Sequence, residues 1–98
     1  MKFIWDKNKN ASNQRKHGLS FELALRVFSD PHQLSIQDRY VDGEERWQTT
    51  GEICGVAIVL VAHTIKEDEG GEEIVRIISA RRAEKHEIRC YEQEKYRF

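Results

Sequence analysis

Long hydrophobic runs are missing from this sequence of 98 residues. No stretch of 18 or more apolar residues occurs, so we expect no membrane-spanning helix. The first residues lack the apolar region of a secretion signal. The only two cysteines, Cys54 and Cys90, fit no metal or redox spacing, which predicts free thiols in a reducing compartment. These absences favour a cytoplasmic protein that makes no contact with a membrane.

Several familiar catalytic patterns are absent as well. The sequence contains no glycine-rich phosphate loop and no Ser, His and Asp set typical of a hydrolase. The four histidines lack the spacing of metal ligands, so we expect neither a metal site nor a bound cofactor. These histidines are His17, His32, His63 and His86.

Charged residues make up 34% of the chain and are unevenly distributed, although the net charge is only −1. Residues 1–20 contain five basic and one acidic side chain, residues 21–75 four basic and twelve acidic, and residues 76–98 seven basic and four acidic. If the two basic ends lie together, they form a basic patch on an acidic body. The alternative is that the acidic middle is only a solvated loop surface.

Local signals predict one α+β domain over residues 1–98. Asp6 suits the N-cap of a polar helix that Gly18 ends, and Ser20 begins a second helix that stops at Asp30 before a proline. Short connections between the later strands favour an antiparallel sheet with helices on one face and the other face open. The predicted elements are a strand at 2–5, helices at 7–17 and between 20 and 30, strands at 34–37, 44–50, 56–64 and 73–80, and a helix at 82–94.

The segment from Val75 to Ala83 has the pattern of a buried strand that continues into a basic helix. Arg76 interrupts its apolar residues, and a charge in a buried strand is costly unless it is paired or faces a site. Ser79 and Arg81 lie at the expected start of the helix, where cations beside a helix N-terminus favour a bound phosphate. The segment therefore predicts a surface that binds RNA or another polyanion.

The same segment carries a family resemblance. Arg76–Ala83 occurs together with five further motifs, in an order and spacing that resembles the BrnT family of bacterial type II toxins: Phe3, Trp5-Asp6, Arg15-Lys16-His17-Gly18, Ser20-Phe21-Glu22 and Gly43-Glu44-Glu45-Arg46-Trp47. The resemblance implies a RelE-like fold, with a small antiparallel sheet, two N-terminal helices and one C-terminal helix. It also implies a toxin that cleaves RNA and stops translation until a BrnA-like ribbon-helix-helix antitoxin neutralises it. DNA would be contacted only through that antitoxin. The chain departs from the family in its long acidic loop at 66–73 and its lower positive charge.

RNA cleavage without a metal uses attack by the ribose 2′-hydroxyl, which needs a base, cations around the phosphate, and an acid for the leaving oxygen. The candidates to hold the phosphate are Arg46, Arg76 and Arg81, and we expect their side chains to open onto one concave surface. Proton transfer is open between His63, His17 and Glu44. Further RNA contacts are predicted from four basic residues: Lys16, Arg82, Lys85 and Arg89.

Structural explanations compete with each of these roles. Arg76 fits an ion pair with Glu44 or Glu45 on a neighbouring strand, and the charges of Lys16 and His17 suit the negative end of a helix. The basic residues near the C-terminus fit a solvated helix face. The alternative function is a non-catalytic protein-binding module that assembles a repressor with a DNA-binding partner.

Overall fold

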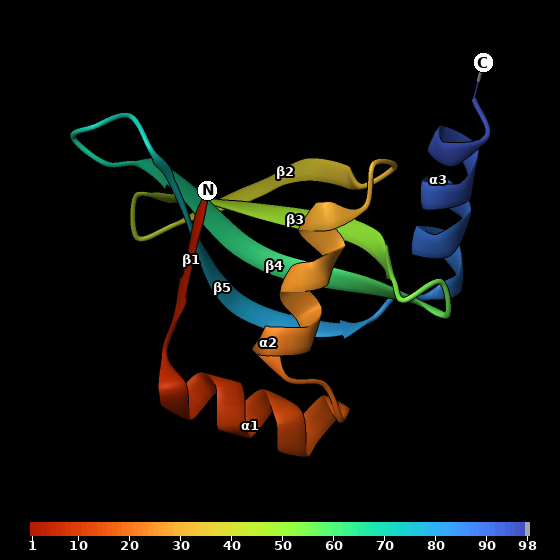
Figure 1. Cartoon of the computed structure of the whole chain (residues 1–98), viewed down its shortest axis with the longest axis horizontal. Coiled ribbons are helices and arrows are strands. Elements are labelled where there is room, and N and C mark those ends of the chain that lie inside the picture. Colours follow the sequence, from red (N-terminus) through yellow and green to blue (C-terminus); the bar gives the residue numbers. More distant parts are fainter. Residues whose placement is uncertain (98) are drawn as a thin grey trace.

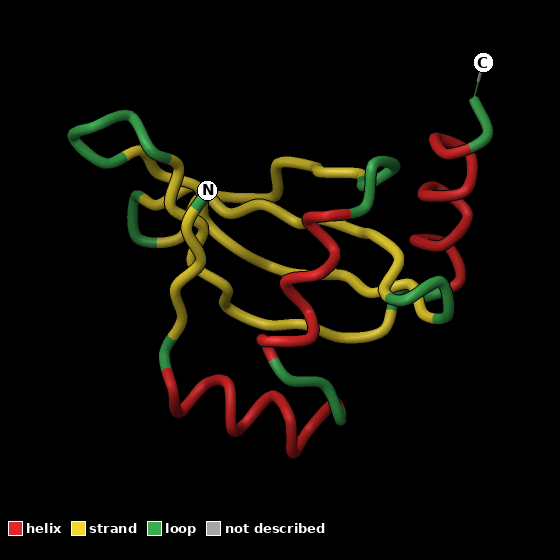
Figure 2. The backbone as a smooth tube through the Cα atoms, viewed as in Figure 1, coloured by secondary structure: helices red, strands yellow, loops and turns green. Residues whose placement is uncertain are grey.

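The computed structural model describes residues 1–97 and forms one five-stranded sheet with helices around it (Figures 1 and 2). The elements, in chain order, are β1 (Lys2–Trp5), α1 (Lys7–His17), α2 (Phe21–Ala24), the 3₁₀ helix η1 (Leu25–Ser29), β2 (Leu34–Val41), β3 (Glu44–Ile53), β4 (Ala57–Glu67), β5 (Glu73–Arg82) and α3 (Lys85–Lys95). The predicted α+β class is therefore confirmed. In this described part of the chain, no helix combines the length and apolar character needed to cross a membrane.

Strands β2 to β5 form an antiparallel meander, and the sheet order is β1-β5-β4-β3-β2. The first strand departs from this pattern because β1 adds to the edge of β5 in parallel. Phe3 then lies opposite Val75, and Trp5 opposite Ile77. The basic N-terminal segment is thereby brought beside β5, whereas α3 lies away from it, at the right of Figure 1.

Helix α1 lies along the edge of the sheet beside β5, and α2 and η1 cover one face of the sheet (Figure 1). The core between them contains Phe21 and Val27 from the helices and Val59, Val61 and Ile77 from the strands, all at most 1% exposed. Gly51 allows η1 to lie directly on β3, because a Cβ at this position would be 2.8 Å from Val27 Cγ1 and 3.0 Å from Val27 O.

The polar helix α1 has the predicted bounds. The Asp6 side chain accepts hydrogen bonds from two backbone N–H groups of the first turn, and Gly18 ends the helix with a left-handed φ of 67°. The buried Asn13 amide attaches α1 to the sheet. It donates to Leu19 O (2.8 Å) and to Ala80 O (2.9 Å), and its oxygen accepts from Ala80 N (3.1 Å).

Strand β5 and helix α3 differ from the prediction at their junction. We expected the strand to end at Ala80 and the helix to begin near Arg82, whereas Arg82 still pairs with Val59 in the sheet and α3 begins at Lys85. Glu84 is the N-cap, and it forms a reciprocal capping box with Glu87. Pairing with distant strands thus extends β5, and a side-chain cap starts the helix later. The strand predicted at 34–37 is likewise longer, because its pairing with β3 continues to Val41 across a bulge.

Helix α3 stands beyond the ends of the strands (Figure 1) and is anchored by polar contacts. Tyr91 is 1% exposed, and its hydroxyl donates a hydrogen bond to the Asp30 carboxylate. Lys95 Nζ lies 3.1 Å from Glu52 Oε2 on β3. The two cysteines are exposed free thiols.

Candidate functional site

The face of the sheet opposite α2 and η1 carries three of the predicted arginines, and we call it the open face. Arg76 lies opposite Thr64, and Arg81 lies opposite Leu60, so both are on the same face of β4. On a regular strand these two arginines would point to opposite faces, because they lie five positions apart and side chains alternate from one position to the next. A bulge opposite Ala62 and His63 restores their alignment. Arg46 joins them, because its carboxylate partner, Glu44, also pairs with Arg76.

Glu44 is the centre of the first cluster on this face. Its carboxylate forms ion pairs with Lys66 (2.9 Å), Arg46 (3.7 Å) and Arg76. The hydrogen bond from Lys66 outweighs burial and, with the charges of Arg76, Lys66 and Arg46, lowers the pKa of Glu44. Glu44 is therefore ionised, and the three cations leave the cluster with two positive charges in excess.

A hollow of about 520 Å³ adjoins this cluster beside the β2–β3 hairpin. Glu44, Arg46 and Lys66 line it, together with the hairpin residues from Tyr40 to Glu45. Within residues 1–97, Arg46 Nε is buried and has no hydrogen-bond partner. An unsatisfied guanidinium N–H beside two further cations is suited to an anionic oxygen.

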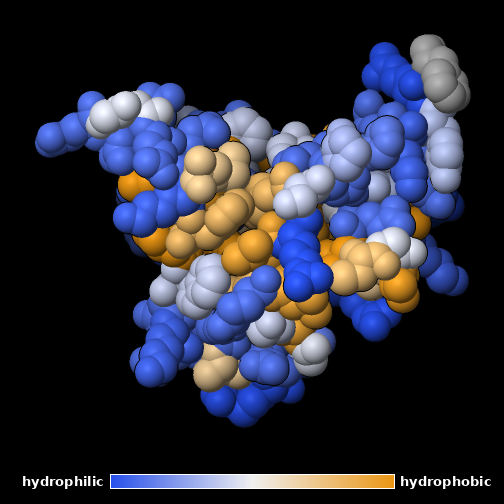
Figure 3. Space-filling model, in the orientation of Figure 1, coloured by the Kyte–Doolittle hydropathy of each residue, from blue (hydrophilic) through white to orange (hydrophobic). Residues whose placement is uncertain are grey.

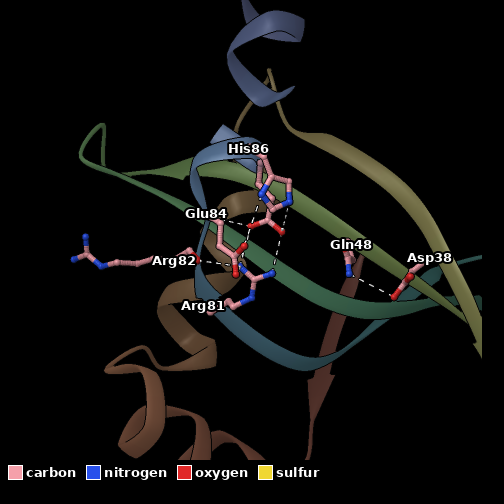
Figure 4. A network of polar contacts seen from close by, with 7 residues as sticks. Asp38, Gln48, Arg81, Arg82, Glu84 and His86 are labelled. Carbon is pink, nitrogen blue, oxygen red and sulfur yellow. Dashed lines mark hydrogen bonds and ion pairs between the residues drawn. The ribbon is translucent and has the colours of Figure 1, made fainter. Parts of the chain in front are cut away.

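Arg81 belongs to a second cluster at the other end of the open face (Figure 4). Its guanidinium donates to both oxygens of Glu87, at 2.8 and 2.9 Å, and lies 4.0 Å from Glu84. The hydrogen bond to Arg81 lowers the pKa of Glu87, and the same bond raises the pKa of Arg81. We expected a phosphate at the start of α3, and in the structure the carboxylates of Glu84 and Glu87 lie at that helix N-terminus.

The three arginines therefore share a face without meeting at one point. Arg46 and Arg76 converge on Glu44, whereas Arg81 lies on the order of 15 Å further along β5, as expected from the rise of a strand. Each is paired with a carboxylate. Between the two clusters, Gln48 Nε2 lies 3.4 Å from Asp38 Oδ2 (Figure 4).

His63 lies on the opposite face, among the core residues. Its ring is 0% exposed, contacts the Phe28 ring edge-on at a centroid distance of 4.9 Å, and shares a hydrogen bond of 2.6 Å with Thr49 Oγ1. Burial lowers the pKa of His63, which keeps the imidazole neutral. The strand parity with Val59 and Val61 was predicted correctly, but that face is covered by helices, and the ring does not reach the open face.

The remaining candidates lie on two other surfaces. Lys16 and His17 are exposed in the last turn of α1, and His17 shares a small hollow with Arg82. Lys85 and Arg89 are exposed one turn apart on α3. The predicted helical stripe of Arg82, Lys85 and Arg89 is wrong in one member, because Arg82 belongs to β5.

Sequence reasoning missed Lys66 as a member of the first cluster, because it assigned residue 66 to an exposed loop. The alternation of β4 contained the signal, since Thr64 and Lys66 share a face with Arg76. Metal ligands are not gathered at either cluster: within residues 1–97, no three His, Cys, Asp or Glu side chains are grouped to hold a metal ion.

Comparison with known proteins identifies the class to which this fold belongs, the ribonuclease toxins. Residues 5–87 match the family model described as ribonuclease toxin, BrnT, of type II toxin-antitoxin system, and the chain belongs to this family. Among solved structures, it is similar to the crystal structure of the Brucella abortus ribonuclease toxin BrnT, at 30% sequence identity and a TM-score of 0.60. That match covers 87% of this chain and 99% of the other. No curated protein matches the chain. The family and fold predicted from the motifs are thus confirmed.

Proposed function

We propose that this chain, as a single toxin domain of residues 1–98, cleaves RNA on the open face without a metal and thereby inhibits translation in the cytoplasm. The observation that carries the proposal is the bulge in β5, which places Arg76 and Arg81 on the same face as Arg46. A chain that used these arginines only for local ion pairs would not need this alignment.

In the proposed reaction, a phosphate of the RNA binds between Arg46 and Arg76. The two guanidiniums stabilise the negative charge that develops on the non-bridging phosphate oxygens as the ribose 2′-oxygen attacks phosphorus. The P–O2′ bond forms, the P–O5′ bond breaks, and the products are a 2′,3′-cyclic phosphate and a 5′-hydroxyl. Metal-independent cleavage rests on this charge stabilisation by side chains alone.

Glu44 is the proton acceptor we assign to the 2′-hydroxyl. Of the three candidates for proton transfer it is the one on the open face, since His63 is buried on the other face and His17 lies at the end of α1. Its lowered pKa keeps it ionised and able to accept a proton, at the cost of weak basicity. The leaving 5′-oxygen takes its proton from water in this scheme.

The test is cleavage of single-stranded RNA by purified Arg46→Ala, Arg76→Ala and Arg81→Ala variants in EDTA. We expect a loss of about 100-fold or more at Arg76, on the scale of one lost donor to a developing oxyanion. Arg26→Ala is the matched control, because Arg26 is an exposed arginine on η1 that bonds to Cys54 Sγ. Wild-type rates in Arg76→Ala would refute the site, and activity that EDTA abolishes and Mg²⁺ restores would refute metal independence.

We further propose that a BrnA-like ribbon-helix-helix antitoxin neutralises the toxin and provides the only contact to DNA. The cations around the junction of β5 and α3 suit an acidic or amphipathic segment of this partner, steered by charge. They are the half-buried Arg81 and the exposed Arg82, Lys85 and Arg89. Association should slow as salt rises and in a Lys85→Glu/Arg89→Glu variant. Unchanged rates in both comparisons would place the antitoxin elsewhere.

A further inference from the structure

The cations of the open face and the cations of helix α1 differ in pairing. Those on the open face are ion-paired, as described for Glu44 and Glu87. Helix α1 is the reverse case: its four cations are exposed, and within residues 1–97 none of them lies at ion-pairing distance from a carboxylate. These four are Lys7, Lys9, Arg15 and Lys16, and α1 contains no acidic residue.

The electrostatics of the helix explain only half of this group. Arg15 and Lys16 lie in the last turn, where the negative end of the helix dipole favours cations. Lys7 and Lys9 lie in the first turn, where the dipole disfavours them and where acidic residues are usual. Positive charge at both ends of the helix therefore needs an explanation outside the helix itself.

The other exposed side chains of α1 indicate which kind of partner would fit. They are Asn8, Ala11, Ser12, Gln14 and His17. Protein interfaces need buried aromatic or aliphatic anchors and are depleted in lysine. Lysine, arginine, asparagine, glutamine and serine are instead the side chains that contact nucleic-acid phosphates. The surface over α1 is accordingly almost wholly hydrophilic (Figure 3).

The position of α1 connects it with the open face through the end of β5. Asn13 bonds α1 to Ala80, and the next two residues, Arg81 and Arg82, point to opposite faces of the sheet (Figure 4). Arg81 is on the open face, and Arg82 shares a hollow with His17 at the end of α1. A strand bound on the open face can thus continue around this edge onto α1.

We propose that α1, with Lys7, Lys9, Arg15 and Lys16, is a second RNA-binding surface that holds the phosphate backbone of the substrate away from the cleaved bond. The proposal rests on the proposed ribonuclease function. Flexible lysines that contact phosphates supply affinity without reading the base sequence. The surface would therefore favour long RNA over short RNA and would not set the cleavage specificity.

The experiment measures binding of a long single-stranded 2′-O-methyl RNA, which lacks the attacking hydroxyl, over a series of salt concentrations. Lys7→Gln/Lys9→Gln is compared with the wild type and with Arg39→Gln/Arg97→Gln, which removes the same charge from exposed sites outside α1. We expect the slope of log affinity against log salt to fall by about 1.4 in the α1 variant, the value for two phosphate contacts on a single strand. The control variant should keep the wild-type slope.

Two outcomes would overturn the proposal. In the first, both variants have the same slope. In the second, the α1 variant keeps the wild-type RNA slope but associates more slowly with the antitoxin, which would make α1 a protein-binding surface. Lys7→Gln/Lys9→Gln removes two cations from the first turn of α1, so its melting temperature should be unchanged or slightly raised. A lower melting temperature would show that the variant is misfolded, independently of the RNA measurement. Because this RNA cannot be cleaved by its own hydroxyl, the result is independent of whether Arg76→Ala abolishes catalysis.

Discussion

Replacing Tyr91 with phenylalanine would test how helix α3 is held to the rest of the protein. The Tyr91 ring is buried, and its hydroxyl donates to the Asp30 carboxylate. Asp30 also accepts from the backbone N–H groups of Glu52 (2.7 Å) and His32 (2.8 Å). One carboxylate therefore joins α3, the end of η1 and strand β3.

The size of the effect follows from what Tyr91→Phe removes. Phenylalanine keeps the ring and its packing, so the variant lacks only the hydroxyl and its bond to a charged acceptor. Such a bond contributes about 2 kcal/mol to the free energy of unfolding. In a domain of this size that corresponds to a decrease in Tm of about 8–16 °C.

The stability difference between Tyr91→Phe and the wild type should also depend on pH. Burial alone would raise the pKa of Asp30, but the hydrogen bonds from Tyr91, Glu52 and His32 outweigh it, and the pKa is lowered. A carboxylate with a lowered folded-state pKa stabilises the protein above its unfolded-state pKa of about 4, and this contribution is lost as the pH falls through the folded-state value. In Tyr91→Phe the pKa of Asp30 should move back up, so the stability difference from the wild type is largest near neutral pH and shrinks in acid.

Urea unfolding followed by circular dichroism, at about pH 7 and about pH 3, measures both quantities. The reasoning would be refuted by a variant as stable as the wild type at neutral pH. It would also be refuted by a stability difference that stays constant on acidification, because the bond would then not depend on the ionised carboxylate.

Three further substitutions test the packing around the sheet. Gly51→Ala should destabilise the protein by about 1–3 kcal/mol in urea unfolding, because the new Cβ meets the Val27 backbone oxygen, and a neutral result would mean that η1 can shift. Asn13→Ala should cost about 2–4 kcal/mol and speed amide exchange at Ala80, whose buried N–H and C=O lose their partners, so unchanged exchange would argue against this anchor. His63 has a lowered pKa, so its contribution to stability is complete above about pH 6.5 and is lost as the pH falls below it. His63→Phe should remove that dependence, and an unchanged pH profile of unfolding would assign it to another group.

Local capping signals predicted α1 correctly because they act within a few residues. The Asp6 carboxylate and Gly18 define the two ends of the helix whatever it packs against. Strand β2 illustrates the opposite case. Its residues 38–41 look like a loop, and they become a strand only because β3 offers a partner as far as Glu44.

The junction of β5 and α3 was mispredicted for a similar reason. Arg82 has good helix propensity, so only its pairing with Val59, distant in the sequence, shows that it lies in a strand. Glutamate is an unusual N-cap, and Glu84 acts as one here through its exchange of hydrogen bonds with Glu87. No glycine in β5 indicates a bulge from the sequence. Without the bulge, side-chain alternation would place Arg76 and Arg81 on opposite faces of the sheet.

The side-chain alternation of β4 could not predict whether His63 is accessible to a substrate. Alternation places it with Val59 and Val61, but it does not say which face of β4 the helices cover. The ring of Phe28, from an element earlier in the chain, closes that face over the imidazole. A titratable side chain was therefore a reasonable candidate from sequence and an inaccessible one in the fold.

The two clusters of the open face differ in what a bound phosphate would require. Around Glu44 there are two excess positive charges, so an RNA phosphate can bind while the carboxylate stays in place. Arg81 is paired with Glu87 and lies near Glu84, so it has no excess charge until α3 moves away.

If Arg81 contacts RNA, then α3 restrains that contact, and loosening its Tyr91 anchor should have opposite effects on stability and on RNA binding. We expect Tyr91→Phe to unfold more easily and yet, while folded at neutral pH, to bind uncleavable RNA more tightly than the wild type. The gain should disappear in Tyr91→Phe/Arg81→Ala, because the helix would then release no cation. Weaker binding by the folded single variant would contradict this argument and would make α3 a support of the RNA site instead of a restraint on it.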